Sequence, residues 1–141
     1  MTPRAVLDAS AAVNLVLNRA HAADLAAKLE DTAVVMTPDL FCAEAANALW
    51  KYVRAKDLTL ESAVARLDEC LRLADSFIPG SSLAQEALAA AARHQCSVYD
   101  MMYAVLARRS AAPVITMDRS FARRLRDLDI DSYCPSLAES P

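Results

Sequence analysis

The chain has 141 residues, a length typical of one compact domain with a sizeable hydrophobic core. Hydrophobic residues make up 55% of it and charged residues 23%, a composition that excludes an intrinsically disordered protein. The formal net charge of −3 offers no general attraction to nucleic acid phosphates, although the distribution of charge matters more than its sum. We therefore predict one globular domain over residues 1–141.

The sequence shows neither a secretory signal nor a membrane span. Its N-terminal apolar run is short and is interrupted by Asp8, and no later stretch is long and apolar enough to cross a bilayer. The four cysteines form no Cys-x-x-Cys pair and have no histidine at ligand spacing, which argues against a zinc site and against a disulfide framework. We predict a cytoplasmic protein with reduced thiols and no membrane contact.

Short apolar runs that predict strands alternate with segments of helical periodicity. The predicted strands are residues 5–7, 33–37, 77–79 and 113–117, with one more short strand expected near the C-terminus. The predicted helices are residues 10–18, 22–30, 40–55, 60–74, 82–94, 97–109 and 120–128. This alternation is typical of βαβ units around a mostly parallel sheet, so we predict an α/β fold.

Hydroxyl side chains stand at three of the predicted helix starts. Ser10 is placed to cap the first helix, and both Ser82 with Gln85 and Ser97 with Asp100 match the capping-box spacing. We expect each hydroxyl to accept a hydrogen bond from a backbone N–H group in the first turn of its own helix.

Four acidic residues lie in unusually apolar surroundings. Asp8 and Asp118 directly follow predicted strands, whereas Glu44 and Asp100 lie in helical segments that are otherwise nearly apolar. In parallel α/β sheets, ligands bind at the carboxyl ends of the strands. The remaining acids lie in charged segments and are expected on solvated surfaces.

Each of the four acids also has a purely structural explanation. Asp8 can be a turn residue, and Glu44 can be a helix-surface residue beside Lys51. Asp100 can be the acid of a capping box, and Asp118 can cap the helix that follows it. Taken singly, these explanations are the better ones for Asp100 and for Asp118.

Taken together, the four acids favour a metal site. Converging carboxylates repel one another, and burial without partners raises their pKa values and lowers stability. A divalent cation removes both problems, and oxygen-only ligands suit Mg²⁺ or Mn²⁺. Two such ions can activate a water and stabilise the leaving oxygen of a phosphoryl displacement.

Four segments in order resemble the motifs of the PIN-domain ribonucleases, and the nearest branch is the VapC-like toxins of toxin–antitoxin modules. The segments are VLDASAAVNLVL, TPDLFCAEAANALWKYV, SVYDMMYAVLARR and VITMDRSFARRL, and the resemblance runs from Val6 to about Leu128. It implies a three-layer α/β/α fold around a mostly parallel sheet. It also implies a metal-dependent endoribonuclease that hydrolyses RNA phosphodiester bonds.

The resemblance assigns roles to individual residues. Asp8, Asp100 and Asp118 would bind Mg²⁺ or Mn²⁺, and Glu44 would bind the cation directly or through water. All four acids would thus be catalytic. Further polar side chains would orient the acids or a water, and these are Ser10, Thr116 and Asn14.

The resemblance also implies partners. The substrate would be RNA, and Arg119 and Arg123 lie just beyond Asp118, where they are candidates for contacts to its phosphates. The protein would form a homodimer and would be inhibited by a cognate antitoxin bound in a groove near the active site.

Two other functions remain open. One is a different phosphate-ester hydrolase with a carboxylate metal site, although the Asp-x-Asp pattern of haloacid-dehalogenase-type phosphatases fails here because Ser10 takes the second position. The other is a non-catalytic module that binds RNA or protein on the same fold. The single glycine of the chain rules out a P-loop or a dinucleotide-binding loop.

Overall fold

A five-stranded sheet lies at the centre of the molecule, and every strand runs parallel to its neighbours. The computed structural model describes residues 2–137. The strands, in the spatial order β3-β2-β1-β4-β5, are β3 (Ser76–Ile78), β2 (Val34–Pro38), β1 (Arg4–Leu7), β4 (Val114–Ile115) and β5 (Ser132–Tyr133). The predicted α/β class and parallel sheet are confirmed.

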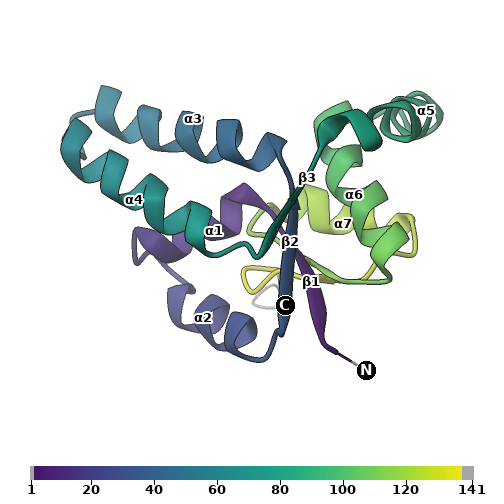
Figure 1. Ribbon diagram of the computed structural model, residues 1–141, viewed down its shortest axis with the longest axis horizontal. Coiled ribbons are helices and arrows are strands. Elements are labelled where there is room, and N and C mark those ends of the chain that lie inside the picture. The colour runs from purple at the N-terminus through teal and green to yellow at the C-terminus, as the bar shows by residue number, and fades with distance from the viewer. Residues whose placement is uncertain (1, 138–141) are drawn as a thin grey trace.

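Helices cover both faces of this sheet. Within the described residues they are α1 (Ala9–Val16), α2 (Ala22–Glu30), α3 (Leu40–Arg54), α4 (Leu60–Arg72), α5 (Ala84–His94), α6 (Val98–Ser110) and α7 (Arg119–Asp127), with one 3₁₀ turn, η1 (Gly80–Ser82). Figure 1 shows α1 to α4 on one side of the strands and α5 to α7 on the other. The three-layer α/β/α arrangement is therefore confirmed.

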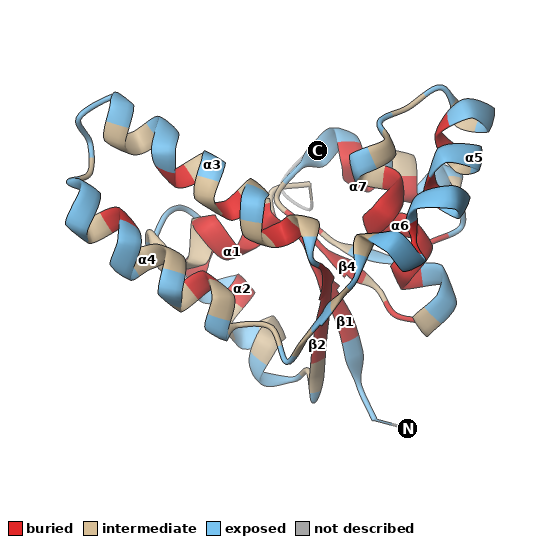
Figure 2. Cartoon of the chain, turned by 45° about the horizontal axis from the view of Figure 1, so that its top comes forward, coloured by how far each residue is buried: buried red, intermediate tan, exposed pale blue. Residues whose placement is uncertain are grey.

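The central strand β1 is buried on both of its faces. Val6 packs with Met36 and Val114 against the α5–α7 layer, whereas its neighbours Ala5 and Leu7 pack against the α1–α4 layer. Successive side chains of a strand point to opposite faces, so a strand between two helical layers must be apolar at every position. Figure 2 shows the buried strands between helices whose exposed sides face outward.

Helix α6 is the most deeply buried helix of the α5–α7 layer. Its residues 101–107 are buried one after another, which is the pattern of a helix surrounded by protein on all sides. Full burial of each large apolar side chain in this run stabilises the fold by roughly 1.5–3 kcal/mol. The helix therefore holds its first turn, which contains Asp100, at a defined place beside the sheet.

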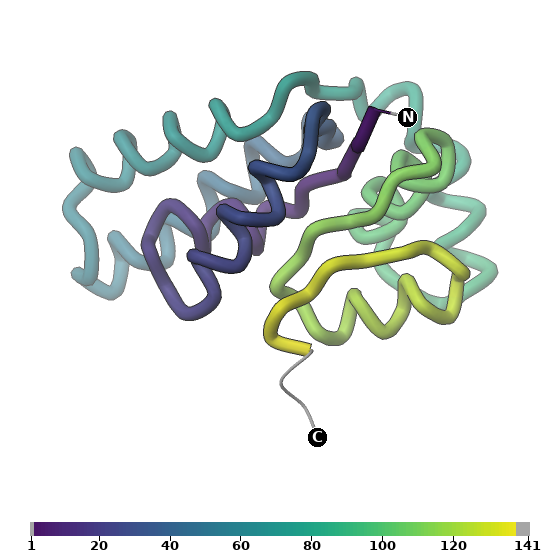
Figure 3. Tube along the Cα trace, turned by 90° about the horizontal axis from the view of Figure 1, so that it is seen from below, coloured from purple at the N-terminus to yellow at the C-terminus, as the bar shows by residue number. Residues whose placement is uncertain are grey.

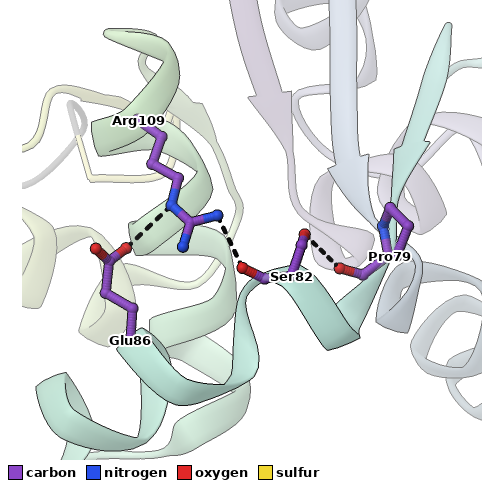
Figure 4. Close-up of polar contacts among 4 residues, drawn as sticks. All are labelled: Pro79, Ser82, Glu86 and Arg109. Atoms are coloured by element: carbon purple, nitrogen blue, oxygen red, sulfur yellow. Dashed lines mark hydrogen bonds and ion pairs between the residues drawn. The ribbon is translucent and has the colours of Figure 1, made fainter.

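The start of α5 differs from its predicted capping box. Ser82 lies in η1 rather than at the helix start, and its hydroxyl donates a hydrogen bond of 2.8 Å to the carbonyl of Pro79 instead of accepting one from α5. Its carbonyl oxygen accepts a hydrogen bond of 2.8 Å from Arg109, which also bonds Glu86 at 3.2 Å (Figure 4). Arg109 thus ties the end of α6 to this turn.

The start of α1 also differs from the prediction. Ser10 lies inside the helix, Asp8 takes the cap position, and the helix ends at Val16 rather than at residue 18. By contrast, Ser97 caps α6 as predicted, because its hydroxyl accepts hydrogen bonds from the N–H groups of Tyr99 and Asp100.

Two expectations about the chain as a whole concern its membrane contacts and its thiols. No helix in residues 2–137 combines the length and the apolar character that a bilayer span requires. The four cysteines, at positions 42, 70, 96 and 134, are all free thiols, as predicted.

The order of the strands creates a switch point beside β1. The chain passes from β1 outward to β2 and β3, and then returns past β1 to form β4 and β5 on its other side. Figure 3 shows this return, with the last described residues running along the β4 side of the sheet. Sites in open α/β sheets form at such a switch point, outside the carboxyl ends of the strands, which here are Leu7 and Ile115.

Candidate active site

Asp8 lies at the switch point and is the most buried acid of the site. It follows β1 directly, is 9% exposed, and its N–H donates to the carbonyl of Ile115 at 2.9 Å. Its Oδ2 accepts hydrogen bonds from the hydroxyls of Ser10 at 2.8 Å and of Thr116 at 2.7 Å. Burial raises the pKa of this carboxyl and outweighs the two hydroxyl bonds, which lower it.

The two hydroxyls belong to a small network that joins β1 to β4. The Ser10 and Thr116 oxygens lie 3.2 Å apart. Ser10 Oγ accepts a hydrogen bond from the N–H of Met117, and Thr116 Oγ1 accepts one from the N–H of Asp118, both at 3.0 Å. These bonds fix the position of Asp8 and of the chain that leads to Asp118.

Asp118 is exposed and caps α7. Its Oδ1 accepts a hydrogen bond of 3.0 Å from the N–H of Phe121, so its structural explanation is correct. The same residue also contributes to the site, because its negative charge raises the pKa values of Asp8 and Asp100. Capping and membership of the acidic cluster are therefore compatible.

Glu44 reaches the site from the second turn of α3, on the other side of the sheet from α6. The hydroxyl of Tyr103 donates a hydrogen bond of 2.7 Å to its Oε1. Burial raises the pKa of Glu44, the bond from Tyr103 lowers it, and the charges of Asp8 and Asp100 raise it. A surface residue that only neighbours Lys51 would experience none of these effects.

Asp100 lies in the first turn of α6 and is half-buried. Its backbone N–H donates to the Ser97 hydroxyl, which accounts for its place in the helix start. Burial, together with the charges of Asp8 and Asp118, raises the pKa of its carboxyl to about 6, although the charge of Arg124 opposes the rise. Asp100 thus shares an electrostatic field with acids that are far from it in sequence.

The structure therefore brings the four acids together. The charge of Asp118 raises the pKa of Asp8. The charges of Asp8 and Asp100 raise the pKa of Glu44, and those of Asp8 and Asp118 raise the pKa of Asp100. In residues 2–137, no three His, Cys, Asp or Glu side chains are already arranged as a set of metal ligands. A Mg²⁺ ion needs no such cage, because it keeps several waters and binds through one or two carboxylates. The all-oxygen donor set suits Mg²⁺ or Mn²⁺.

Two of the three predicted supporting residues contact Asp8. Ser10 and Thr116 bond Asp8 directly, but Asn14 is one turn further along α1, and its buried Oδ1 has no hydrogen-bond partner among the described residues. Arg119 is exposed in the first turn of α7, and Arg123 lines a pocket of about 250 Å³ that also reaches Asp100.

One protein family matches the part of the chain that contains this site. The family described as the PIN domain matches residues 5–125, a range that contains all four acids. The chain belongs to the PIN domain family.

One named protein and one crystal structure, both from Pyrobaculum aerophilum, are similar to this PIN domain along most of its length. Ribonuclease VapC3 is 29% identical over 121 residues, which cover 84% of this chain and 92% of the relative. The crystal structure of PAE2754 superposes with a TM-score of 0.67 at 27% identity, over 88% of this chain and 87% of the other. The predicted resemblance to PIN-domain and VapC-like proteins is confirmed.

Tyr103 is a member of this PIN-domain site that the sequence analysis missed. It is buried, and burial raises the pKa of its hydroxyl above the usual range, so the group stays protonated and donates to Glu44. Its spacing from Asp100 was the available signal, because residues three apart share one face of a helix.

The first prediction concerns stability without metal. The pKa of Asp100 is about 6 in the folded chain and 3.8 for an unperturbed aspartate. Between these two pH values, folding is therefore accompanied by the uptake of a proton by this carboxyl. In EDTA, the free energy of unfolding should therefore rise as the pH falls from 7.5 to 5. Urea titrations should show a smaller rise for Asp100→Asn and an unchanged rise for the exposed control Asp57→Asn. Identical pH profiles for wild type and Asp100→Asn would contradict this assignment.

Proposed function

We propose that this protein is a metal-dependent endoribonuclease and the toxin of a toxin–antitoxin module. The observation that carries the proposal is the convergence of Asp8, Glu44, Asp100 and Asp118 at the switch point of the sheet. The similarity to Ribonuclease VapC3 supports RNA as the substrate and a toxin as the role. Uncompensated, this concentration of negative charge would repel an RNA phosphate, so the site needs a cation.

Asp8, Asp100 and Asp118 would hold Mg²⁺ or Mn²⁺, with Glu44 bound directly or through water. Such a cation lowers the pKa of a water and neutralises charge on a phosphate under attack. The choice between the two metals, and between one ion and two, stays a prediction from the carboxylate donor set.

The side chains of the site would hold the acids in position and accept a proton from the attacking water. Ser10 and Thr116 hold the Asp8 carboxylate at one place, since both hydroxyls bond its Oδ2. Tyr103 holds Glu44 by one oxygen and leaves the other to orient a water or accept its proton. Preorganisation of this kind lowers the cost of aligning the attacking water with the phosphodiester.

The second prediction tests the reaction. Purified protein should cleave single-stranded RNA in Mg²⁺ or Mn²⁺ and not in EDTA. Asp8→Asn and Asp100→Asn should each lower kcat/KM by at least about 100-fold, the upper end of what a residue bonded only to a metal ligand contributes. Asp57→Asn should cleave as wild type does. Circular dichroism would check that the variants are folded.

Full activity of both Asp8→Asn and Asp100→Asn would contradict the proposed active site. A folded wild-type protein that binds RNA but cleaves none, under any divalent cation, would instead favour the non-catalytic binding module. Cleavage of simple phosphate monoesters without cleavage of RNA would favour another phosphate-ester hydrolase.

The third prediction concerns Arg123, which lines the pocket beside Asp100. We propose that it contacts an RNA phosphate, as does Arg119 at the start of α7. Arg123→Ala should weaken RNA binding and reduce the slope of log affinity against log salt by about 1. Arg126→Ala, an exposed arginine one turn further along α7, is the matched control. An unchanged slope for Arg123→Ala would remove this residue from the RNA surface.

An apolar groove between α3 and α4 is the surface we assign to the antitoxin. It encloses about 190 Å³ and is lined by residues that include Trp50, Leu60 and Val64, whose side chains are 52%, 69% and 59% exposed. A groove of this kind fits the apolar face of an amphipathic helix. The homodimer and the cytoplasmic location stay predictions from the sequence.

The fourth prediction tests the antitoxin groove. The toxin role predicts that a small antitoxin is encoded next to this gene. Val64→Asp should abolish co-purification with that antitoxin, because a charge in an apolar interface is left without a partner. Leu88→Asp on α5 is the control, since its side chain is 62% exposed, much like the 59% of Val64. Equal capture by both variants would exclude the groove as the antitoxin site.

A further inference from the structure

A second polar pocket opens on the α1–α3 side of the acids. It encloses about 380 Å³, within the roughly 300–1,000 Å³ typical of small-ligand pockets. Its polar lining comes from Ser10, Asn14, Arg19, Lys51 and Tyr52. We call it the α1–α3 pocket. No role in the four-acid site accounts for it.

The α1–α3 pocket is cationic, although the chain as a whole carries a net charge of −3. Among the described residues, Arg19 and Lys51 are its only charged lining residues, and both are exposed. The four acids lie just beyond its Ser10 edge, because the Ser10 hydroxyl donates to Asp8. Lys51 is two helical turns after Glu44 on α3. A ligand in this pocket would therefore meet positive charge on one side and the acids on the other.

Arg19 is held in place at the pocket wall. Its backbone N–H donates a hydrogen bond of 3.0 Å to the carbonyl of Asn14, which closes the turn after α1. Its guanidinium carbon lies 5.4 Å from the centre of the Tyr52 ring, a cation–π contact. Aromatic rings and guanidinium planes are the surfaces on which proteins stack unpaired RNA bases.

Asn14 supplies an unsatisfied hydrogen-bonding group at the same pocket. Its Oδ1 is buried without a partner among the described residues, which costs about 1–3 kcal/mol relative to a satisfied group. An amide at this position therefore contributes little to stability. A rotation of the side-chain amide would offer the oxygen to a donor on a ligand. The four nucleobases carry their N–H donors at different places on their edges, so an acceptor at a fixed place can discriminate among them.

The two pockets lie on opposite sides of the acids. The pocket that holds Arg123 is built from α6 and α7, whereas the α1–α3 pocket belongs to the opposite helical layer. An extended strand that places one phosphate at the acids would thus run between the Arg123 pocket and the α1–α3 pocket.

We propose that the α1–α3 pocket binds the base of the nucleotide next to the cleaved bond and selects it. In this arrangement Arg19 and Tyr52 stack on the base, Lys51 pairs with a neighbouring phosphate, and Asn14 accepts a hydrogen bond from the base edge. The assignment rests on the proposed ribonuclease function for the identity of the ligand.

The fifth prediction tests this assignment on two readouts. Wild-type protein should prefer one base at a single position beside the cleaved bond, as measured by kcat/KM on short RNAs that vary at each flanking position. Asn14→Leu, which keeps the side-chain size but removes its polar atoms, should reduce that preference by about 10-fold. Its kcat/KM values for RNAs that vary only at positions on the Arg123 side should vary as little as those of the wild type. Asn47→Leu, an exposed asparagine on α3 outside the pocket, should behave as wild type.

The second readout needs no cleavage. Titration of wild-type protein in EDTA with the four ribonucleoside monophosphates, followed by NMR, should show one that binds best and shifts signals of α1 and α3. Asn14→Leu should lose this discrimination. Loss of cleavage with retained discrimination would overturn only the ribonuclease function. Equal binding of all four, or a base preference that survives in Asn14→Leu, would overturn the base pocket.

Discussion

Mutual repulsion among four carboxylates is the constraint on which the rest of this structure depends. Asp8, Glu44 and Asp100 have raised pKa values because burial and the neighbouring acids both disfavour their charged forms. A protein designed only for stability would not place acids together at the end of a buried strand. The scaffold must therefore supply enough apolar burial to hold them there, and the proposed cation would relieve the repulsion that remains.

The scaffold meets this demand by placing β1 between two helical layers. Its apolar residues are buried on both faces, so the strand cannot shift without exposing core on one side or the other. Asp8 follows at its end, and the Ser10 and Thr116 hydroxyls fix the carboxylate against β4. Tyr103, anchored in the buried run of α6, does the same for Glu44 across the switch point.

The distribution of charge would reconcile the proposed RNA site with an acidic chain. Arg123 and Arg124 line a pocket on the α6–α7 side together with Asp100 and Asp127, and Arg19 and Lys51 line the α1–α3 pocket. Negative charge is concentrated between them, where a cation is proposed to act, and positive charge flanks it, where RNA phosphates would lie. Net charge alone misses this pattern because it sums over groups that face different neighbours.

The sequence by itself determined the alternation of strands and helices, the parallel sheet and the four candidate acids, because periodicity and the position of an acid after an apolar run are local signals. Tertiary structure decided what those residues contact. Ser10 was predicted both to cap its own helix and to orient the acids; it does not cap the helix, and it bonds Asp8 and a hydroxyl 106 residues away. Glu44 is held by Tyr103, 59 residues away, and Asn14 lines the α1–α3 pocket together with Ser10. Such pairings depend on how the layers pack, which no local pattern encodes.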